Sequence, residues 1–252
     1  DAAAIVRGDV TGLAIPAHAD ALRAGGAAFL STAFQAFGSL DPGTRVTRIT
    51  RFENCPGGST GQKLFLSVEY DPPAPQLHGD LFVKFSRDFS DPLRDRGRFE
   101  IASEVRFAAL SRLADFPVSV PRAYYADYHQ ESGTGVLITQ RIPFGVGGIE
   151  PQHQKCLDHE LADPASYYRA IVTALARLAA AISRSAASGS ERIRGRACQV
   201  RAVLFLAAVA RRRAAAWRTG PRARTRHAAR SLWRLCRRRQ SQRIGNLVRP
   251  GR

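Results

Sequence analysis

A short stretch at residues 76–88, QLHGDLFVKFSRD, decides which fold the sequence predicts. Its centre, from Asp80 to Ser86, is typical of a β-strand because apolar residues dominate it. Strand alternation places Leu81, Val83 and Phe85 on one face and Phe82, Lys84 and Ser86 on the other. A lysine in an apolar strand is unfavourable unless its ammonium finds an anion or reaches solvent. The pattern therefore predicts either an anion-binding lysine or an exposed lysine on a half-solvated strand.

The patterns on both sides of this strand predict a mixed α+β domain. Further strands are expected at residues 45–52, 63–70, 121–129 and 135–142, and helices at 19–37, 98–113 and 163–183. The first helix carries a weak point at Gly25-Gly26, and the last begins with an Asp-Pro pair suited to a helix start. Between the first two strands, residues 53–61 read ENCPGGSTG and predict a flexible loop rich in glycine.

Composition limits the class of protein. The chain has 252 residues, of which 44% are hydrophobic and 23% charged, enough for one large domain or two modest lobes. No window approaches the roughly 18 apolar residues that a membrane span needs, and the start lacks the pattern of a secretion signal. The four cysteines form no C-x-x-C pair, so neither a disulfide framework nor a zinc site is expected. A cytoplasmic location fits best, and the absence of methionine predicts a processed, trimmed or fragmentary chain.

The net charge of +17 is concentrated in the last quarter of the chain. Residues 184–252 contain 20 arginines and one acid, Glu191, whereas residues 1–183 contain 18 bases and 20 acids. An Arg-rich tail with Trp217 and Trp233 as stacking residues is one way to bind nucleic acid. The tail has no recognisable binding motif, however, and its Arg, Ala, Gly and Pro bias is also what an out-of-frame GC-rich gene yields. A frameshift or divergent terminus beginning near residues 182–190 is the favoured hypothesis.

The order of these elements resembles the amino-terminal lobe of the protein-kinase-like fold, and more narrowly the aminoglycoside phosphotransferase and related small-molecule kinase family. The resemblance covers about residues 45–183: strand, glycine loop, strand, lysine strand, helix with glutamate, two strands, linker and helix. It implies a five-stranded antiparallel sheet plus a helix. The implied divisions are an N-terminal helical segment at 1–44, a nucleotide-binding lobe at 45–142, a linker and first helix of a second lobe at 143–183, and the tail at 184–252.

The resemblance also implies which residues bind ATP. Glycines let backbone amides approach phosphates closely, and the matching positions here are Gly57, Gly58, Ser59, Thr60 and Gly61. Lys84 would contact the α- and β-phosphates, held by a glutamate of the following helix. Glu104 is the expected partner, with Glu100 in reserve. Taken singly, each motif has a plainer interpretation, namely an ordinary hairpin loop and two solvated acids near a helix start.

At the end of the last strand, the backbone of Gln140, Arg141 and Ile142 would pair with an adenine edge, and residues 143–148, PFGVGG, would connect to a second lobe. Phosphoryl transfer also requires a catalytic aspartate, an asparagine and a further aspartate that hold Mg²⁺. No aspartate follows Asp163, and beyond Asn54 the chain has one asparagine, Asn246. The sequence therefore predicts no catalytic or metal-ligating residues and an inactive polypeptide.

His78-Gly79-Asp80 resembles the family's catalytic triplet, but it precedes the lysine strand and lacks an asparagine five residues after the aspartate, where Phe85 stands. We interpret it as a turn into the strand. The partners implied are a nucleotide and an unknown small-molecule hydroxyl acceptor. A non-catalytic kinase-like interaction protein and a nucleic-acid-binding protein remain as alternatives.

Overall fold

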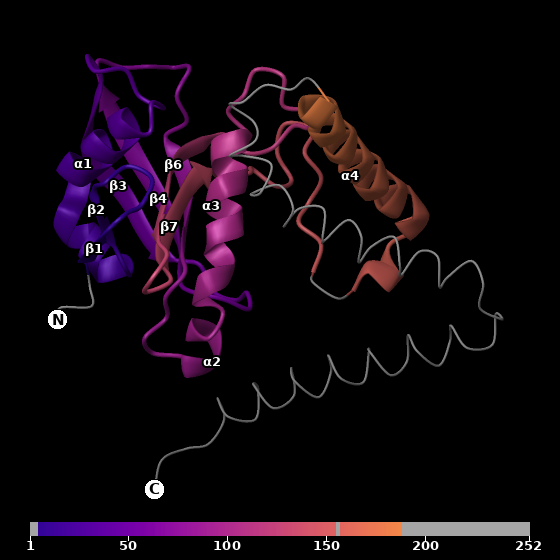
Figure 1. The fold of residues 1–252 in the computed structure, drawn as a ribbon, viewed down its shortest axis with the longest axis horizontal. Helices are drawn as coiled ribbons and strands as arrows, with labels where there is room; N and C mark the ends of the chain where they lie inside the picture. Colours follow the sequence, from indigo (N-terminus) through magenta and orange to yellow (C-terminus); the bar gives the residue numbers. More distant parts are fainter. Residues whose placement is uncertain (1–4, 155–156, 188–252) are drawn as a thin grey trace, which may run out of the picture. The chain divides into compact units, whose positions relative to one another are not determined.

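A computed structural model describes residues 5–154 and 157–187 of the chain (Figure 1). The chain divides into two compact units, and the boundary between them along the sequence lies between Pro143 and Phe144, inside the predicted linker. The first unit is a mixed α/β structure with a five-stranded antiparallel sheet. Most of the predicted Arg-rich tail, with Trp217 and Trp233, lies outside the described residues, as do Cys156, Cys198 and Cys236.

All five predicted strands are present in one sheet. The strands are β3 (Arg45–Asn54), β4 (Lys63–Asp71), β5 (Asp80–Phe85), β6 (Ala123–His129) and β7 (Thr134–Gln140). Their order in space is β3-β4-β5-β7-β6, and every neighbouring pair is antiparallel. The β6 strand starts two residues later than expected, after Pro121, which has no N–H to contribute to the ladder.

The predicted helices are present with small changes at their ends. They are α1 (Ala19–Ala36), α3 (Ile101–Leu110) and α4 (Pro164–Ala187). A short helix that was not predicted, α2 (Pro92–Asp95), follows β5, and 3₁₀ turns lie at Arg98–Glu100 and Asp158–Glu160. The weak point predicted in α1 is a break in helical geometry at Gly26. The helix predicted at 98–113 begins as a 3₁₀ turn and ends at Leu110. In the described residues no helix is both long and apolar enough to cross a membrane.

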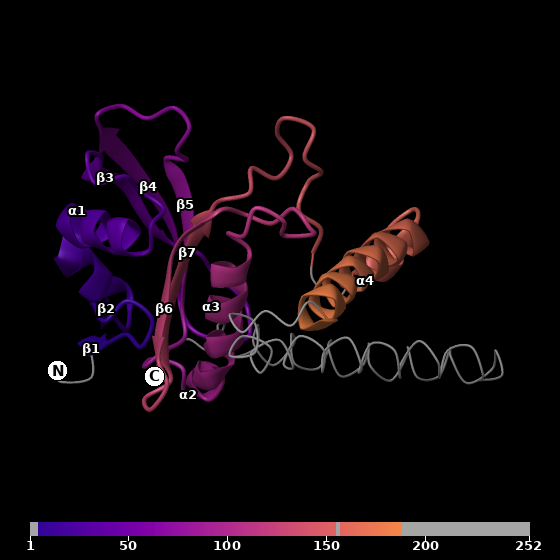
Figure 2. The same cartoon turned by 45° about the horizontal axis from the view of Figure 1, so that its top comes forward.

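The helices α1 and α3 lie on opposite sides of the sheet (Figures 1 and 2). On the α1 side, Phe34 contacts the ring of Tyr124, with centroids 5.4 Å apart, and Phe29 contacts Tyr125 at 5.8 Å. Two consecutive strand residues normally face opposite sides of a sheet. A register irregularity between Ala123 and Tyr125 explains how both tyrosines reach α1.

A two-stranded hairpin at the N-terminus was not predicted. It consists of β1 (Ile5–Arg7) and β2 (Ala14–Pro16), so the segment expected to be helical also contains strands. The buried carboxylate of Asp127 on β6 accepts hydrogen bonds from the N–H groups of Val10 and Thr11, both at 2.9 Å. Such short strands give no periodic signal, and a buried acid 116 residues away holds their turn.

Candidate functional site

The glycine loop connects β3 to β4 and has a conformation that requires glycine. Gly57, Gly58 and Gly61 have φ angles of 91°, 84° and 53°, in the left-handed region. At Gly61 a Cβ atom would lie 1.7 Å from the carbonyl oxygen of Phe85 on β5. The loop therefore packs against the C-terminal end of β5, the strand that carries Lys84, at a distance too short for any residue with a Cβ atom.

Lys63, the first residue of β4, lies under this loop. Its Nζ donates to the carbonyl oxygens of Thr60 at 2.7 Å, Gly57 at 3.3 Å and Gly61 at 3.4 Å. Burial, and then the positive charges of Arg94 and Lys84, lower the pKa of Lys63 to about 8. Sequence reasoning missed this residue.

The sequence feature that could have identified Lys63 is its position directly after the glycine loop, at the start of β4. Because β4 and β5 pair antiparallel, Lys63 stands opposite Lys84 in the ladder. Two lysines at one cross-strand position repel each other unless anions are near. This local excess of positive charge was visible only once the register was known.

The short helix α2 anchors the loop from its other side. Arg94 donates to the carbonyl oxygen of Gly61 and forms an ion pair with Asp88 at 2.9 Å, and Asp88 is 2% exposed. Asp91 caps the helix by accepting from the N–H groups of Leu93 at 3.1 Å and Arg94 at 3.2 Å. The loop is thus positioned by β4, β5 and α2 together.

The expected ion pair between Lys84 and Glu104 is present. The Nζ of Lys84 lies 2.6 Å from Oε1 of Glu104 on α3, and the two side chains are 17% and 39% exposed. The alternation predicted for β5 is confirmed, since Leu81, Val83 and Phe85 are buried on the face opposite Lys84. Glu100, the reserve candidate, is an exposed residue of the 3₁₀ turn before α3 and forms no ion pair within the described residues.

The arrangement favours an anion electrostatically. Lys84 is paired with Glu104 and Arg94 with Asp88, whereas Lys63 contacts only neutral carbonyl groups. Within the described part of the chain, none of the five N–H groups from Gly57 to Gly61 donates to a protein acceptor. Consecutive N–H groups without protein acceptors, beside a cation, are the kind of donors that phosphate oxygens accept from. Ser59 and Thr60 lie in this same run.

Of the three residues at the end of β7 whose backbone was expected to pair with adenine, two have N–H groups that already donate to protein carbonyls. The N–H of Gln140 donates to the carbonyl of Arg122 at 2.8 Å, and the N–H of Arg141 donates to the carbonyl of Asp80 at 3.1 Å. The N–H of Ile142 has no protein acceptor among residues 5–154 and 157–187. Ile142 is therefore the position where a backbone donor remains for a base edge.

The triplet His78-Gly79-Asp80 leads directly into β5, as interpreted, with a bend at Gly79 and the strand beginning at Asp80. The N–H of His78 donates to the hydroxyl of Tyr124 at 2.6 Å, and its carbonyl accepts from Tyr70 at 3.0 Å. Ser67 donates to the Asp80 carboxylate at 2.5 Å. All three contacts hold the turn against the sheet.

In the part of the chain that the structure describes, no group of three His, Cys, Asp or Glu side chains lies close enough to hold a metal ion. The described residues therefore do not fit the Mg²⁺ that the resemblance implies. Comparisons of the chain with protein-family models, with curated proteins and with solved structures found no match.

Proposed function

We propose that residues 45–142 form a nucleotide-binding lobe that takes ATP, in a protein of the small-molecule phosphotransferase type with a protein-kinase-like fold. The observation that carries the proposal is the Lys84–Glu104 ion pair, 2.6 Å long, beside a loop with five free N–H groups. In kinases a strand lysine held by a helix glutamate positions the phosphates of the nucleotide.

The charge balance of the site supports a phosphate ligand. Lys63 places one uncompensated positive charge under the loop, and Lys84 stands opposite it in the sheet. Bound phosphates would accept from the loop amides and offset both ammonium groups. The adenine would lie toward Ile142, whose N–H is free in the described residues.

We do not expect this chain to transfer a phosphoryl group. A catalytic aspartate and the Asn and Asp ligands of Mg²⁺ would have to follow the linker and first helix of the second lobe, residues 143–183, and no aspartate follows Asp163 in this chain. The lobe would therefore bind nucleotide without transferring a phosphoryl group to the small-molecule hydroxyl acceptor that the resemblance implies. An assay with ATP and candidate hydroxyl acceptors is expected to show no phosphorylated product, and clear turnover would contradict this.

Isothermal titration of the full chain with ATP tests the binding. Lys84→Ala is expected to weaken binding at least tenfold, because it removes a cation proposed to contact the phosphates and leaves Glu104 unpaired. The matched control is Arg48→Ala, which removes one positive charge from an exposed ion pair with Glu69 on the same sheet. Both variants keep the Arg-rich tail, so any binding of ATP to the tail cancels in the comparison.

Two outcomes would overturn the proposal: no ATP binding by the unaltered chain, or equal affinities for Lys84→Ala and Arg48→Ala. The first outcome would favour a non-catalytic interaction protein. Binding that depends steeply on salt and is shared by DNA would favour the nucleic-acid reading of the tail.

A further inference from the structure

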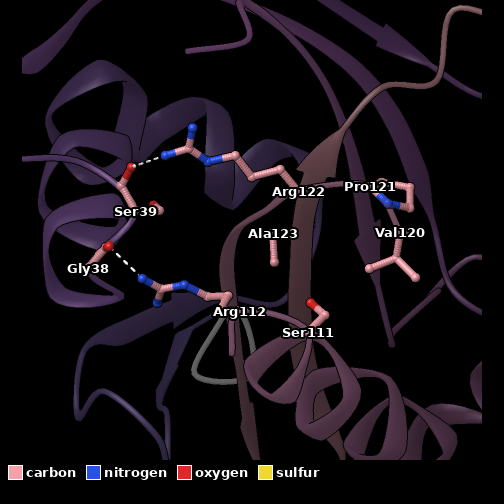
Figure 3. Close-up of a pocket in the computed structure, with 8 residues that line it drawn as sticks. All are labelled: Gly38, Ser39, Ser111, Arg112, Val120, Pro121, Arg122 and Ala123. Carbon is pink, nitrogen blue, oxygen red and sulfur yellow. Dashed lines mark hydrogen bonds between the residues drawn. The ribbon is translucent and has the colours of Figure 1, made fainter. Parts of the chain in front are cut away.

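A pocket lies away from the glycine loop, where the C-terminal ends of α1 and α3 meet the segment that enters β6 (Figure 3). Its volume is about 310 Å³, at the lower end of the range of small-ligand sites. Two arginines, Arg112 after α3 and Arg122 before β6, both extend toward Gly38 and Ser39 at the end of α1. The remaining lining residues are Gly38, Ser39, Ser111, Val120, Pro121 and Ala123.

Both guanidinium groups are held in place by backbone carbonyls. Arg112 donates to the carbonyls of Phe37 and Gly38, the latter at 2.5 Å, and so completes the C-terminus of α1. Arg122 donates to Ser39 at 3.2 Å and to Gln76 at 3.4 Å. Each guanidinium has five N–H donors, and these contacts use two of them.

No carboxylate within the described residues forms an ion pair with either arginine. Burial, and then the neighbouring charge of Arg122, lower the pKa of Arg112. Two like charges that share a pocket without an acid are unfavourable, and a bound anion would relieve that repulsion. The carbonyls at the end of α1 offset only part of the charge.

We propose that this pocket binds the phosphate group of a small phosphate monoester. Two preorganised guanidinium forks match the geometry and the double negative charge of a phosphate monoester. The pocket is larger than a phosphate group, and Val120, Pro121 and Ala123 supply an apolar wall for a small organic part. The site shares no lining residue with the glycine loop, so the inference does not depend on ATP binding.

The test is an amide NMR titration of the isotope-labelled full chain with glycerol 3-phosphate, at ionic strength held constant with chloride. Saturable shifts are expected at Gly38, Ser39 and Ala123, with glycerol as the uncharged control. Arg122→Gln is expected to weaken binding at these resonances at least tenfold. Arg45→Gln removes one charge from an exposed ion pair with Asp71 and is expected to leave the affinity unchanged.

A second variant covers the case in which Arg122→Gln does not fold. Ser111→Asp places a carboxylate at the pocket, where it would pair with the arginines and abolish binding of glycerol 3-phosphate while the fold is retained. Absence of shifts in the unaltered chain, or the same affinity in Arg45→Gln as in Arg122→Gln or Ser111→Asp, would overturn the proposal. Lys84→Ala is expected to leave this titration unchanged, which separates it from the test of nucleotide binding.

Discussion

Lys63 has a partly buried environment that its position in the sequence did not predict. Its ammonium is enclosed by three carbonyls of the glycine loop and lies near two other cations. Because the pKa in the folded state is lowered to about 8 from 10.5, the unfolded chain binds more protons between these pH values. The contribution of Lys63 to folding stability therefore rises with pH across that window.

We expect this lowered pKa to be measurable directly. The chain has three lysines, Lys63, Lys84 and Lys155, so reductive ¹³C-methylation gives three dimethyl-lysine signals that single Lys→Arg variants assign. The signal of Lys63 is expected to titrate with a pKa near 8. Addition of ATP is expected to raise that pKa, because phosphate charge favours the ammonium form. An unaltered pKa near 10.5 would show that Lys63 is fully solvated and not enclosed by the loop.

Among the elements, the glycine loop is expected to be sensitive to substitution where it contacts β5. Gly61→Ala is expected to cost about 3 kcal/mol or more, because a Cβ would lie 1.7 Å from the Phe85 carbonyl and the φ angle is 53°. Gly57→Ala is the matched control, since its φ of 91° is also positive and unsuited to alanine but a Cβ there meets nothing within 4 Å. It is expected to cost about 1–2 kcal/mol of backbone strain.

Urea denaturation of the two variants under identical conditions measures the difference. Equal losses of stability would mean that the loop moves away from β5 to accept the methyl group. The loop would then be less rigidly held than its contacts with Lys63 and Arg94 indicate.

For the molecule as a whole, the connection between the two units gives a testable boundary. The first unit ends at Pro143 and the second begins at Phe144. Just after this boundary, the side chains of Phe144, Val146 and Ile149 are 47%, 64% and 40% exposed. Exposed apolar residues in a segment with three glycines are accessible to a protease. Limited chymotrypsin digestion is expected to leave a persistent fragment that ends at Phe144.

Phe144→Ser removes the cleavage site and is the control, because it is expected to abolish that fragment without changing the stability of the first unit. A persistent fragment that ends before residue 140 would contradict the boundary, since β7 would then be cut. Mass spectrometry of the fragment distinguishes the two results.

Much of the sheet was predictable because strand and helix periods are local. The alternation around Lys84 identified both faces of β5, and the spacing of apolar residues located α3, whereas the choice of Glu104 over Glu100 came from the resemblance to the kinase family. The Asp-Pro pair correctly marked the start of α4, where Asp163 accepts from the N–H of Ser166 at 3.2 Å. The N-terminal hairpin and α2 were missed, because elements of three or four residues have no measurable period.

The local pattern of the sequence determined the five strands and the main helices, since each depends on residues close together along the chain, whereas the Lys84–Glu104 pair was expected from the family resemblance. Only the tertiary structure decided that Lys63 stands opposite Lys84, that Asp127 holds the turn at Thr11, and that Arg112 meets Arg122 in one pocket. These contacts depend on strand register and on the packing of distant segments. Neither leaves a periodic trace in the sequence.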